Sequence, residues 1–73
     1  MPARGIKYLV KQDRATGRWN VLREDQPTGA FARDQDTAIG SATRDASLEA
    51  RGNDLKVSVW VQEGTKARKV WPA

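Results

Sequence analysis

Aromatic and cationic side chains alternate near the end of the chain. Residues 55–61 and 67–71 are rich in strand formers, and Glu63-Gly64-Thr65 between them is typical of a turn. Because alternate residues of a strand share a face, one face of this hairpin is expected to carry two tryptophans among basic residues. Indole rings stack on unpaired bases, and nearby cations attract phosphates. The candidate partner-binding residues are Trp60, Trp71, Lys56, Lys69 and Arg68.

The same pattern fits two other interpretations. A two-residue turn at Gly64-Thr65 sets Val59 opposite Val70 on the inner face, and Leu9 or Leu22, with Lys7 and Lys11, extends the outer one. Because tryptophan is enriched at the centres of protein interfaces, the outer face also suits a protein partner or a homodimer. A register slip would instead turn both rings into the core. Protein interface, nucleic-acid surface and ordinary core therefore remain open.

Metal and cofactor chemistry is poorly supported by the residue types. The chain has no His and no Cys, which removes the commonest metal ligand, the usual general base and any disulfide. Asp34-Gln35-Asp36 has the alternation of a calcium loop but lacks its later Gly and Glu. Helix capping explains these acids better. We expect no metal site and no cofactor.

Catalysis is equally hard to assemble from this sequence. Ser58 and Lys56 share a strand face, but a lysine base needs a depressed pKa in a dry pocket, which a single small sheet rarely provides. The six glycines are scattered, so no phosphate-binding loop is present. The sequence therefore favours a binding protein over an enzyme, with no catalytic residues.

Length and charge limit the remaining classes. The chain has 73 residues, which is enough for a single domain, 1–73. Residues 1–4 are expected to be a disordered N-terminus. The net charge is +4. The positive charge favours polyanionic partners by long-range attraction. No apolar run is long enough to span a bilayer, and residues 1–5 lack the apolar stretch of a secretory signal. The absence of Cys fits a reducing compartment, so we expect a cytoplasmic protein with no membrane partner.

Three strands are expected before the helix. Apolar and polar residues alternate in 6–11 and 18–24, and the turn residues 13–17 join them as an antiparallel hairpin. Trp19 shares a face with Val21 and is expected in the core. Residues 25–29 contain Pro and Gly and are interpreted as a loop. Residues 30–33 form a short third strand, with Phe31 as a core anchor.

One helix is expected over 34–51. Asp34 or Asp36 can cap its first turn by accepting backbone amides. Leu48 falls off the apolar face, and Gly52-Asn53 ends the helix. The apolar face is built mostly from alanines at helical spacing, namely Ala38, Ile39, Ala42, Ala46 and Ala50.

The order β-β-(β)-α-β-β predicts an α+β fold, a small antiparallel sheet with one helix packed on one face. Tyr8-Leu9-Val10, the run from Trp19 to Glu24, and Phe31 followed by a helix with Asp34 and Ala38-Ile39 resemble short bacterial proteins of the domain-of-unknown-function 2188 family. The resemblance runs from about Lys7 to Trp71. It departs at Gly40 and in the last hairpin, which has more tryptophan and less glycine. It implies this fold and a bacterial source, and no activity, since the family has none assigned.

Overall fold

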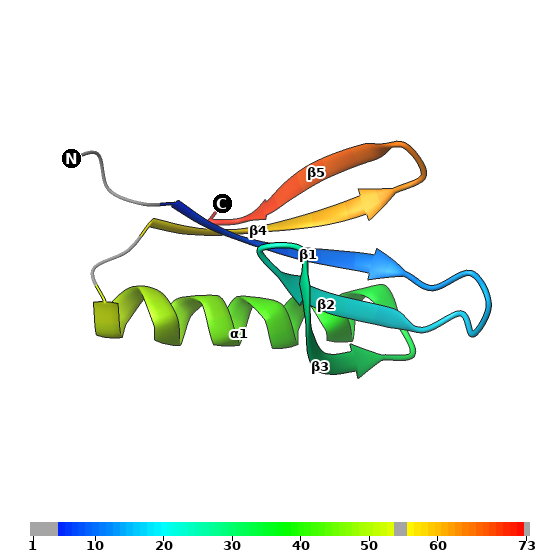
Figure 1. Cartoon of the computed structure of the whole chain (residues 1–73), viewed down its shortest axis with the longest axis horizontal. Helices are drawn as coiled ribbons and strands as arrows, with labels where there is room; N and C mark the ends of the chain where they lie inside the picture. Colours follow the sequence, from blue (N-terminus) through cyan, green and yellow to red (C-terminus); the bar gives the residue numbers. More distant parts are fainter. Residues whose placement is uncertain (1–4, 54–55, 73) are drawn as a thin grey trace.

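Five strands and one helix make up the described part of the protein. The computed structural model describes residues 5–53 and 56–72, so the predictions for residues 1–4 and for Leu55 lie outside the described residues. The elements are β1 (Gly5–Gln12), β2 (Trp19–Arg23), β3 (Gln26–Ala32), α1 (Gln35–Asn53), β4 (Lys56–Glu63) and β5 (Lys66–Trp71) (Figure 1). No helix in the described part is both long and apolar enough to cross a bilayer.

The α+β fold is confirmed, but the sheet is mixed rather than purely antiparallel. Its strand order is β3-β2-β1-β4-β5, and β4 pairs parallel to β1 while every other pair is antiparallel. The chain reverses direction at each of the first two hairpins and again on entering and leaving α1, so β4 runs in the direction of β1. The helix provides the long crossover that neighbouring parallel strands require.

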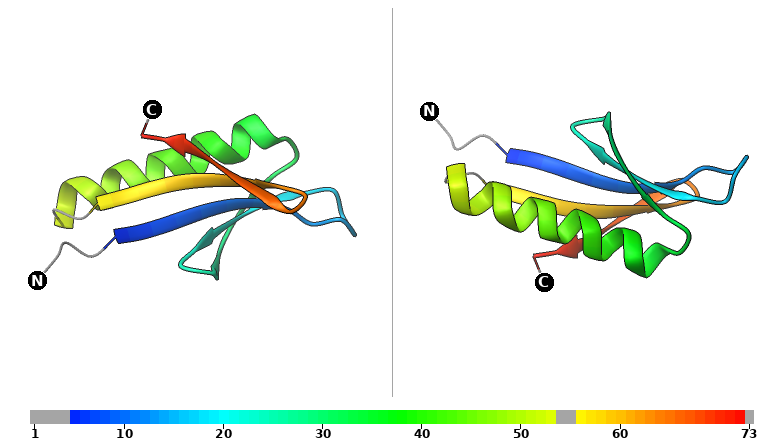
Figure 2. Two further views of the ribbon diagram at one scale, coloured as in Figure 1. Left: turned by 90° about the horizontal axis from the view of Figure 1, so that it is seen from above. Right: turned by 90° about the horizontal axis from the view of Figure 1, so that it is seen from below.

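The core lies between α1 and one face of the sheet (Figure 2). Ala38, Ala42 and Ala46 are fully buried, which confirms the alanine face of the helix. Small side chains let the helix backbone lie close to the sheet at a modest gain in buried area per residue. The buried strand residues opposite them are Ile6, Tyr8, Val10, Val21, Val57, Val59 and Val61.

The first turn of α1 is capped by Asp34. Its Oδ2 accepts the backbone N–H of Thr37 at 2.9 Å, and the Thr37 hydroxyl donates to the same carboxylate. These bonds hold the pKa of Asp34 below its usual value. Of the two expected caps, Asp34 takes the role; the helix then runs to Asn53, two residues beyond the predicted end.

The third strand is longer than predicted because its preceding turn was not recognised. Glu24 and Asp25 both have positive φ, at 49° and 65°, as the two central residues of a mirror-image hairpin turn require. This conformation favours Asn and Gly, so a Glu-Asp pair does not predict it. The strand therefore begins at Gln26, and Pro27 is tolerated because β3 is an edge strand.

Phe31 is not a core anchor, so that prediction was wrong. It pairs with Asn20, and its side chain is 57% exposed. The β2–β3 register shifts between Asn20 and Leu22, and the Thr28 hydroxyl donates to the Val21 carbonyl at 2.9 Å beside this irregularity. Phe31 instead contacts the Arg18 guanidinium, 4.7 Å from its ring centroid.

The closing hairpin has the predicted turn but not the predicted register. Gly64 and Thr65 connect β4 to β5, with Gly64 at φ 63°. Val59 lies opposite Trp71 rather than Val70, because a β-bulge interrupts the pairing between Val59 and Trp60. A bulge inserts one unpaired residue and changes which side chains share a face.

Candidate binding surface on the open sheet face

The sheet has a second face, which we call the open face, turned away from α1. Strand alternation places on it the residues between the buried ones of β1, β2 and β4. Leu22, Leu9 and Trp60 are direct cross-strand neighbours, and Lys69 continues the row on β5. An apolar row therefore crosses three strands of the open face and ends at a cation.

Trp60 is held in place by two neighbours. Its indole N–H donates to the Ser58 hydroxyl at 3.0 Å. The Lys7 ammonium lies 4.6 Å from the ring centroid, within range of a cation–π contact. One indole face is thus paired with a cation that a bound phosphate could draw away.

Lysines border the apolar row. Lys7 and Lys11 flank Leu9 on β1, and Lys69 lies opposite Trp60; all three are exposed. Acidic groups enter at one corner, where Glu24 and Asp25 of the β2–β3 turn line a small hollow with Lys7 and Leu9. Apart from this corner, the charged residues that border the row are basic, and neutral polar residues of β2 and β4 complete the border.

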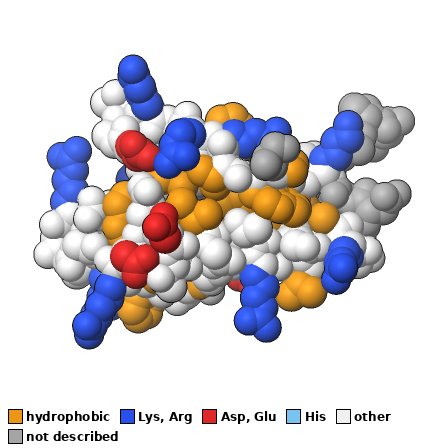
Figure 3. Space-filling view, turned by 180° about the vertical axis from the view of Figure 1, so that it is seen from behind, with side chains coloured by type: hydrophobic (Ala, Val, Ile, Leu, Met, Phe, Trp, Pro, Cys, Tyr) orange, Lys and Arg blue, Asp and Glu red, His pale blue; other side chains and the backbone are white. Residues whose placement is uncertain are grey.

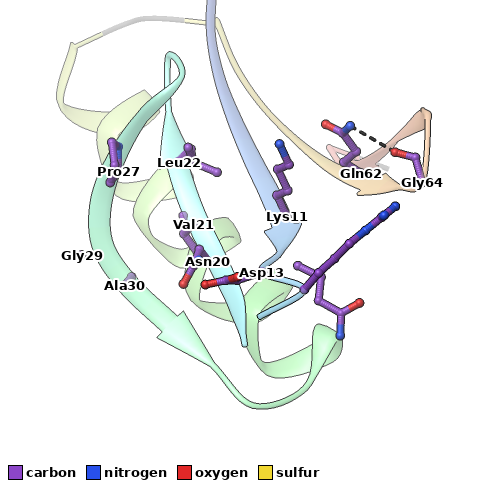
Figure 4. Close-up of a pocket in the computed structure, with 12 residues that line it drawn as sticks. Lys11, Asp13, Asn20, Val21, Leu22, Pro27, Gly29, Ala30, Gln62 and Gly64 are labelled. Atoms are coloured by element: carbon purple, nitrogen blue, oxygen red, sulfur yellow. Dashed lines mark hydrogen bonds between the residues drawn. The ribbon is translucent and has the colours of Figure 1, made fainter. Parts of the chain in front are cut away.

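A larger hollow opens beside the row, at the end of β1. It has a volume of about 730 Å³ and lies between β3 on one side and the β4–β5 turn on the other (Figure 4). Its lining includes the cations Lys11 and Arg14 and the amides Asn20 and Gln62. Leu22 and Pro27 supply an apolar wall. The open face is therefore concave here rather than flat.

Three of the five predicted binding residues share the open face. Lys56, Trp60 and Lys69 lie on it, as strand alternation and the β4–β5 register require. Of the residues expected to extend this surface, Lys7, Leu9, Lys11 and Leu22 lie on it as well. The structure therefore brings together most of the expected surface around one tryptophan.

The other two predicted residues lie elsewhere. Trp71 pairs with Val59 and packs, half-buried, against the core on the helix side, so the expectation of two indoles on one outer face was wrong. The bulge is the physical reason. Arg68 lies opposite Val61 and forms an exposed ion pair with Glu63 at 3.0 Å.

The residues of the hollow were missed by sequence reasoning. Lys11 meets Gln62 only because β1 and β4 pair in parallel, 51 positions apart in the chain. Asn20 joins them through the β1–β2 hairpin, and Arg14 through its loop. The hairpin alternation could have placed Asn20 beside Lys11, but no local signal indicates the contact with β4.

A second polar cluster lies on the helix side. Glu49 of α1 accepts the Tyr8 hydroxyl at 2.6 Å and an Arg23 Nε–H at 3.0 Å, and forms an ion pair with Arg23. Burial, with help from Glu49, raises the pKa of Tyr8 to about 12. Hydrogen bonds from Arg23 and Tyr8 lower the pKa of Glu49. The cluster ties β1 and β2 to the helix, so we interpret it as structural.

Apolar side chains also reach the surface on the helix side of the sheet. Seen from behind, they form a band across the middle, with Lys and Arg side chains around it (Figure 3). Trp71, Val70 and Ile39 are among the partly buried hydrophobics packed around the core. One helix thus leaves part of its own side of the sheet accessible.

Metal chemistry and known relatives offer no further guide. The described residues contain no group of three or more acidic side chains placed to hold a metal ion. No family model, no curated protein and no solved structure matches this chain. The resemblance to the domain-of-unknown-function 2188 proteins stays a prediction.

Proposed function

We propose that this protein is a non-enzymatic binding module whose open face holds single-stranded nucleic acid. The observation that carries the proposal is the apolar row Leu22–Leu9–Trp60, bordered by exposed lysines on the face of the sheet that no described element covers. We assign it to the cytoplasm, following the expectation from its composition.

The row has the two properties that unpaired nucleic acid needs. Bases stack on aromatic and apolar side chains, while lysines beside them attract the phosphate backbone. Lys69 at the end of the row and Lys7 over the Trp60 ring bring charge and aromatic surface together. When phosphate draws the Lys7 ammonium aside, an indole face becomes available to a base.

Charge also argues against pairing of two open faces in a homodimer. Such a dimer brings the lysines of one copy towards those of the other, and like charges at an interface cost several kcal/mol. With Trp71 turned to the helix side, the apolar area available to offset this cost is smaller than the sequence suggests.

A protein partner remains a second candidate through a different feature, the β3 edge. Residues Gln26–Ala32 carry no charge, and Phe31 at this edge is 57% exposed. The opposite edge, β5, carries Lys66, Arg68 and Lys69, which discourage pairing with another strand. An added strand or a second copy would therefore pair at β3.

Binding of a fluorescent mixed-sequence oligonucleotide tests the main proposal. We expect log K to fall with log salt by about 0.7 per phosphate contact between about 50 and 200 mM salt. Trp60→Ala should weaken binding by about 1–3 kcal/mol. Leu48→Ala is the control, because Leu48 is a large apolar residue exposed on the helix, away from the open face.

Two results would decide against this function. Absence of binding at about 50 mM salt removes the nucleic-acid proposal, because phosphate contacts are strongest there. A dimer in light scattering that Phe31→Glu converts into a folded monomer supports the protein-partner candidate instead.

A further inference from the structure

The hollow at the end of β1 has the composition of a small-molecule site. Its volume of about 730 Å³ lies within the range of about 300–1,000 Å³ typical of ligand pockets. Such pockets combine an apolar wall with a few convergent polar groups. Here Leu22 and Pro27 form the wall, and Asn20, Lys11 and Gln62 supply the polar groups.

The three polar residues form one continuous row across the sheet. Lys11 of β1 is the Cα partner of Asn20 on β2 and of Gln62 on β4. Two side-chain amides thus lie on either side of a cation, on three hydrogen-bonded strands. A row fixed by the sheet is more rigid than one built on loops.

The two amides are available to a ligand in complementary ways. The Gln62 Nε2–H donates to the Gly64 carbonyl at 3.2 Å, which orients the side chain and leaves its oxygen as an acceptor (Figure 4). The half-buried Asn20 amide has no hydrogen-bond partner among the described residues, so it offers both a donor and an acceptor. Amides of this kind pair with base edges, best with adenine N6 and N7.

Charge in the hollow favours an anion beside that base. Lys11 and Arg14 contribute two cations to its lining. Asp13 is the acidic residue of the lining, and its Oδ1 already accepts the Ala15 backbone N–H at 2.9 Å. A phosphate group therefore meets positive charge, with the carboxylate engaged in its own turn.

The hollow is continuous with the proposed nucleic-acid surface. Lys11 follows Leu9 by two residues on β1, about 6.6 Å along the strand at about 3.3 Å per residue. Gln62 follows Trp60 by the same interval on β4. A nucleotide next to one stacked on Trp60 is thus within reach of the hollow.

We propose that this hollow binds one nucleotide of the bound strand, with its base between Asn20 and Gln62 and its phosphate near Lys11 and Arg14. The inference rests on the proposed function and adds to it a site that selects among bases. Adenine is the expected preference, because the edge that carries its N7 presents a donor (N6) beside an acceptor (N7) to an amide, whereas the same edge of guanine presents two acceptors.

Backbone amide shifts during titration with free nucleotides test the hollow separately from the strand. The probes are adenosine, guanosine, cytidine and uridine monophosphates at millimolar concentration, with inorganic phosphate alone as the reference. We expect adenosine monophosphate to move the amides of Lys11, Asn20 and Gln62 most. Asn20→Ala should weaken its binding by at least about fivefold.

Matched variants separate the base site from the stacking row. Gln26→Ala removes an exposed amide of β3 that does not line the hollow and should leave nucleotide binding unchanged. Trp60→Ala should weaken oligonucleotide binding while free adenosine monophosphate still binds at the hollow.

Each failure has its own signature. Equal shifts from phosphate and from all four nucleotides mean a general anion site, and overturn the base site. Oligonucleotide binding without any nucleotide shift at the hollow also overturns it, while the proposed function stands. Nucleotide shifts at the hollow without oligonucleotide binding remove the proposed function and overturn the placement of a strand nucleotide in the hollow, which is then a site for free nucleotides only.

Discussion

At the scale of single residues, Glu49 joins three elements through its contacts with Tyr8 and Arg23. Its side chain belongs to α1 and is 15% exposed. It accepts hydrogen bonds from Tyr8 of β1 and Arg23 of β2. Losing one partner of a charged hydrogen bond leaves the other groups poorly satisfied. The helix otherwise contacts the sheet mainly through alanines, so this cluster carries much of the specific polar contact between the layers.

Glu49→Gln should therefore lower the free energy of unfolding by about 1–2 kcal/mol. This is less than the loss expected for a fully buried charged hydrogen bond, because the Arg23 side chain is 43% exposed to solvent. Urea unfolding measures it. Glu63→Gln breaks the exposed pair with Arg68 and is the matched control, expected to cost about 0–1 kcal/mol. Equal effects of the two changes would contradict a structural role for Glu49.

The lowered pKa of Glu49 also sets a pH dependence of stability. A carboxyl whose pKa is lower in the folded state contributes stability above its ordinary value of 4.5, and loses it as pH falls through the lowered value. Wild-type stability should thus fall in acid more steeply than that of Glu49→Gln. Parallel urea midpoints of the two proteins from neutral to acid pH would argue against this linkage.

Tyr8 provides a direct optical readout of the same cluster. It is the chain's single tyrosine, so the tyrosinate absorbance reports this residue alone. We expect a midpoint near pH 12 rather than 10, because burial and the neighbouring carboxylate disfavour the phenolate. The stability linked to Tyr8 is present below pH 10 and lost as pH rises towards 12. A midpoint near 10 in the folded protein would show that the hydroxyl is not enclosed as described.

At the scale of elements, the interior of α1 contains a glycine, Gly40, that weakens the helix without an evident packing reason. Gly40 is exposed, and a Cβ built on it would meet nothing within 4 Å. Glycine in a helix interior costs about 0.5–1 kcal/mol relative to alanine, because it loses more backbone freedom on folding. The helix can therefore be strengthened without changing the sheet.

Gly40→Ala should raise the free energy of unfolding by about 0.5–1 kcal/mol, seen as a higher thermal midpoint. Gly64→Ala is the control, because Gly64 has a φ of 63° that alanine rarely adopts, so this change should destabilise the protein. A destabilised Gly40→Ala variant would mean that the helix meets something at this position that the fold does not show.

Elements with a strong local pattern were predictable, and their long-range pairing was not. The alanine spacing identified the helix and its buried face, and the acidic residues Asp34 and Asp36 marked its start without deciding which of them caps it. The strand alternation identified β1, β2, β4 and β5. The positive-φ turn at Glu24-Asp25 and the bulge beside Val59 depend on the chain around them, so β3 was shortened and Trp71 was placed on the wrong face.

At the scale of the whole molecule, one helix cannot cover five strands. A helix is about 10 Å wide, whereas five strands spaced about 4.8 Å apart span about 19 Å between the outer axes. The molecule is elongated, 40 × 22 × 22 Å, with α1 along its length (Figures 1 and 2). One helix therefore covers only part of one face of the sheet. No described element packs on the opposite face, the open face, which carries the Trp60 row and the hollow.

Cations lie both on the open face and on α1, so their effects on binding can be compared at the same net charge. Lys11→Gln with Lys69→Gln, and Arg44→Gln with Arg51→Gln, each reduce the net charge from +4 to +2, since 4 − 2 = 2. The first pair removes cations of the open face, and the second removes exposed cations of α1. Because released counterions follow phosphate contacts, the open-face double variant should lose about 1.4 from the slope of log K against log salt, at about 0.7 per contact. The helix double variant should keep the wild-type slope. Equal loss in both would mean that an oligonucleotide responds to overall charge and that the open face has no special part in binding it.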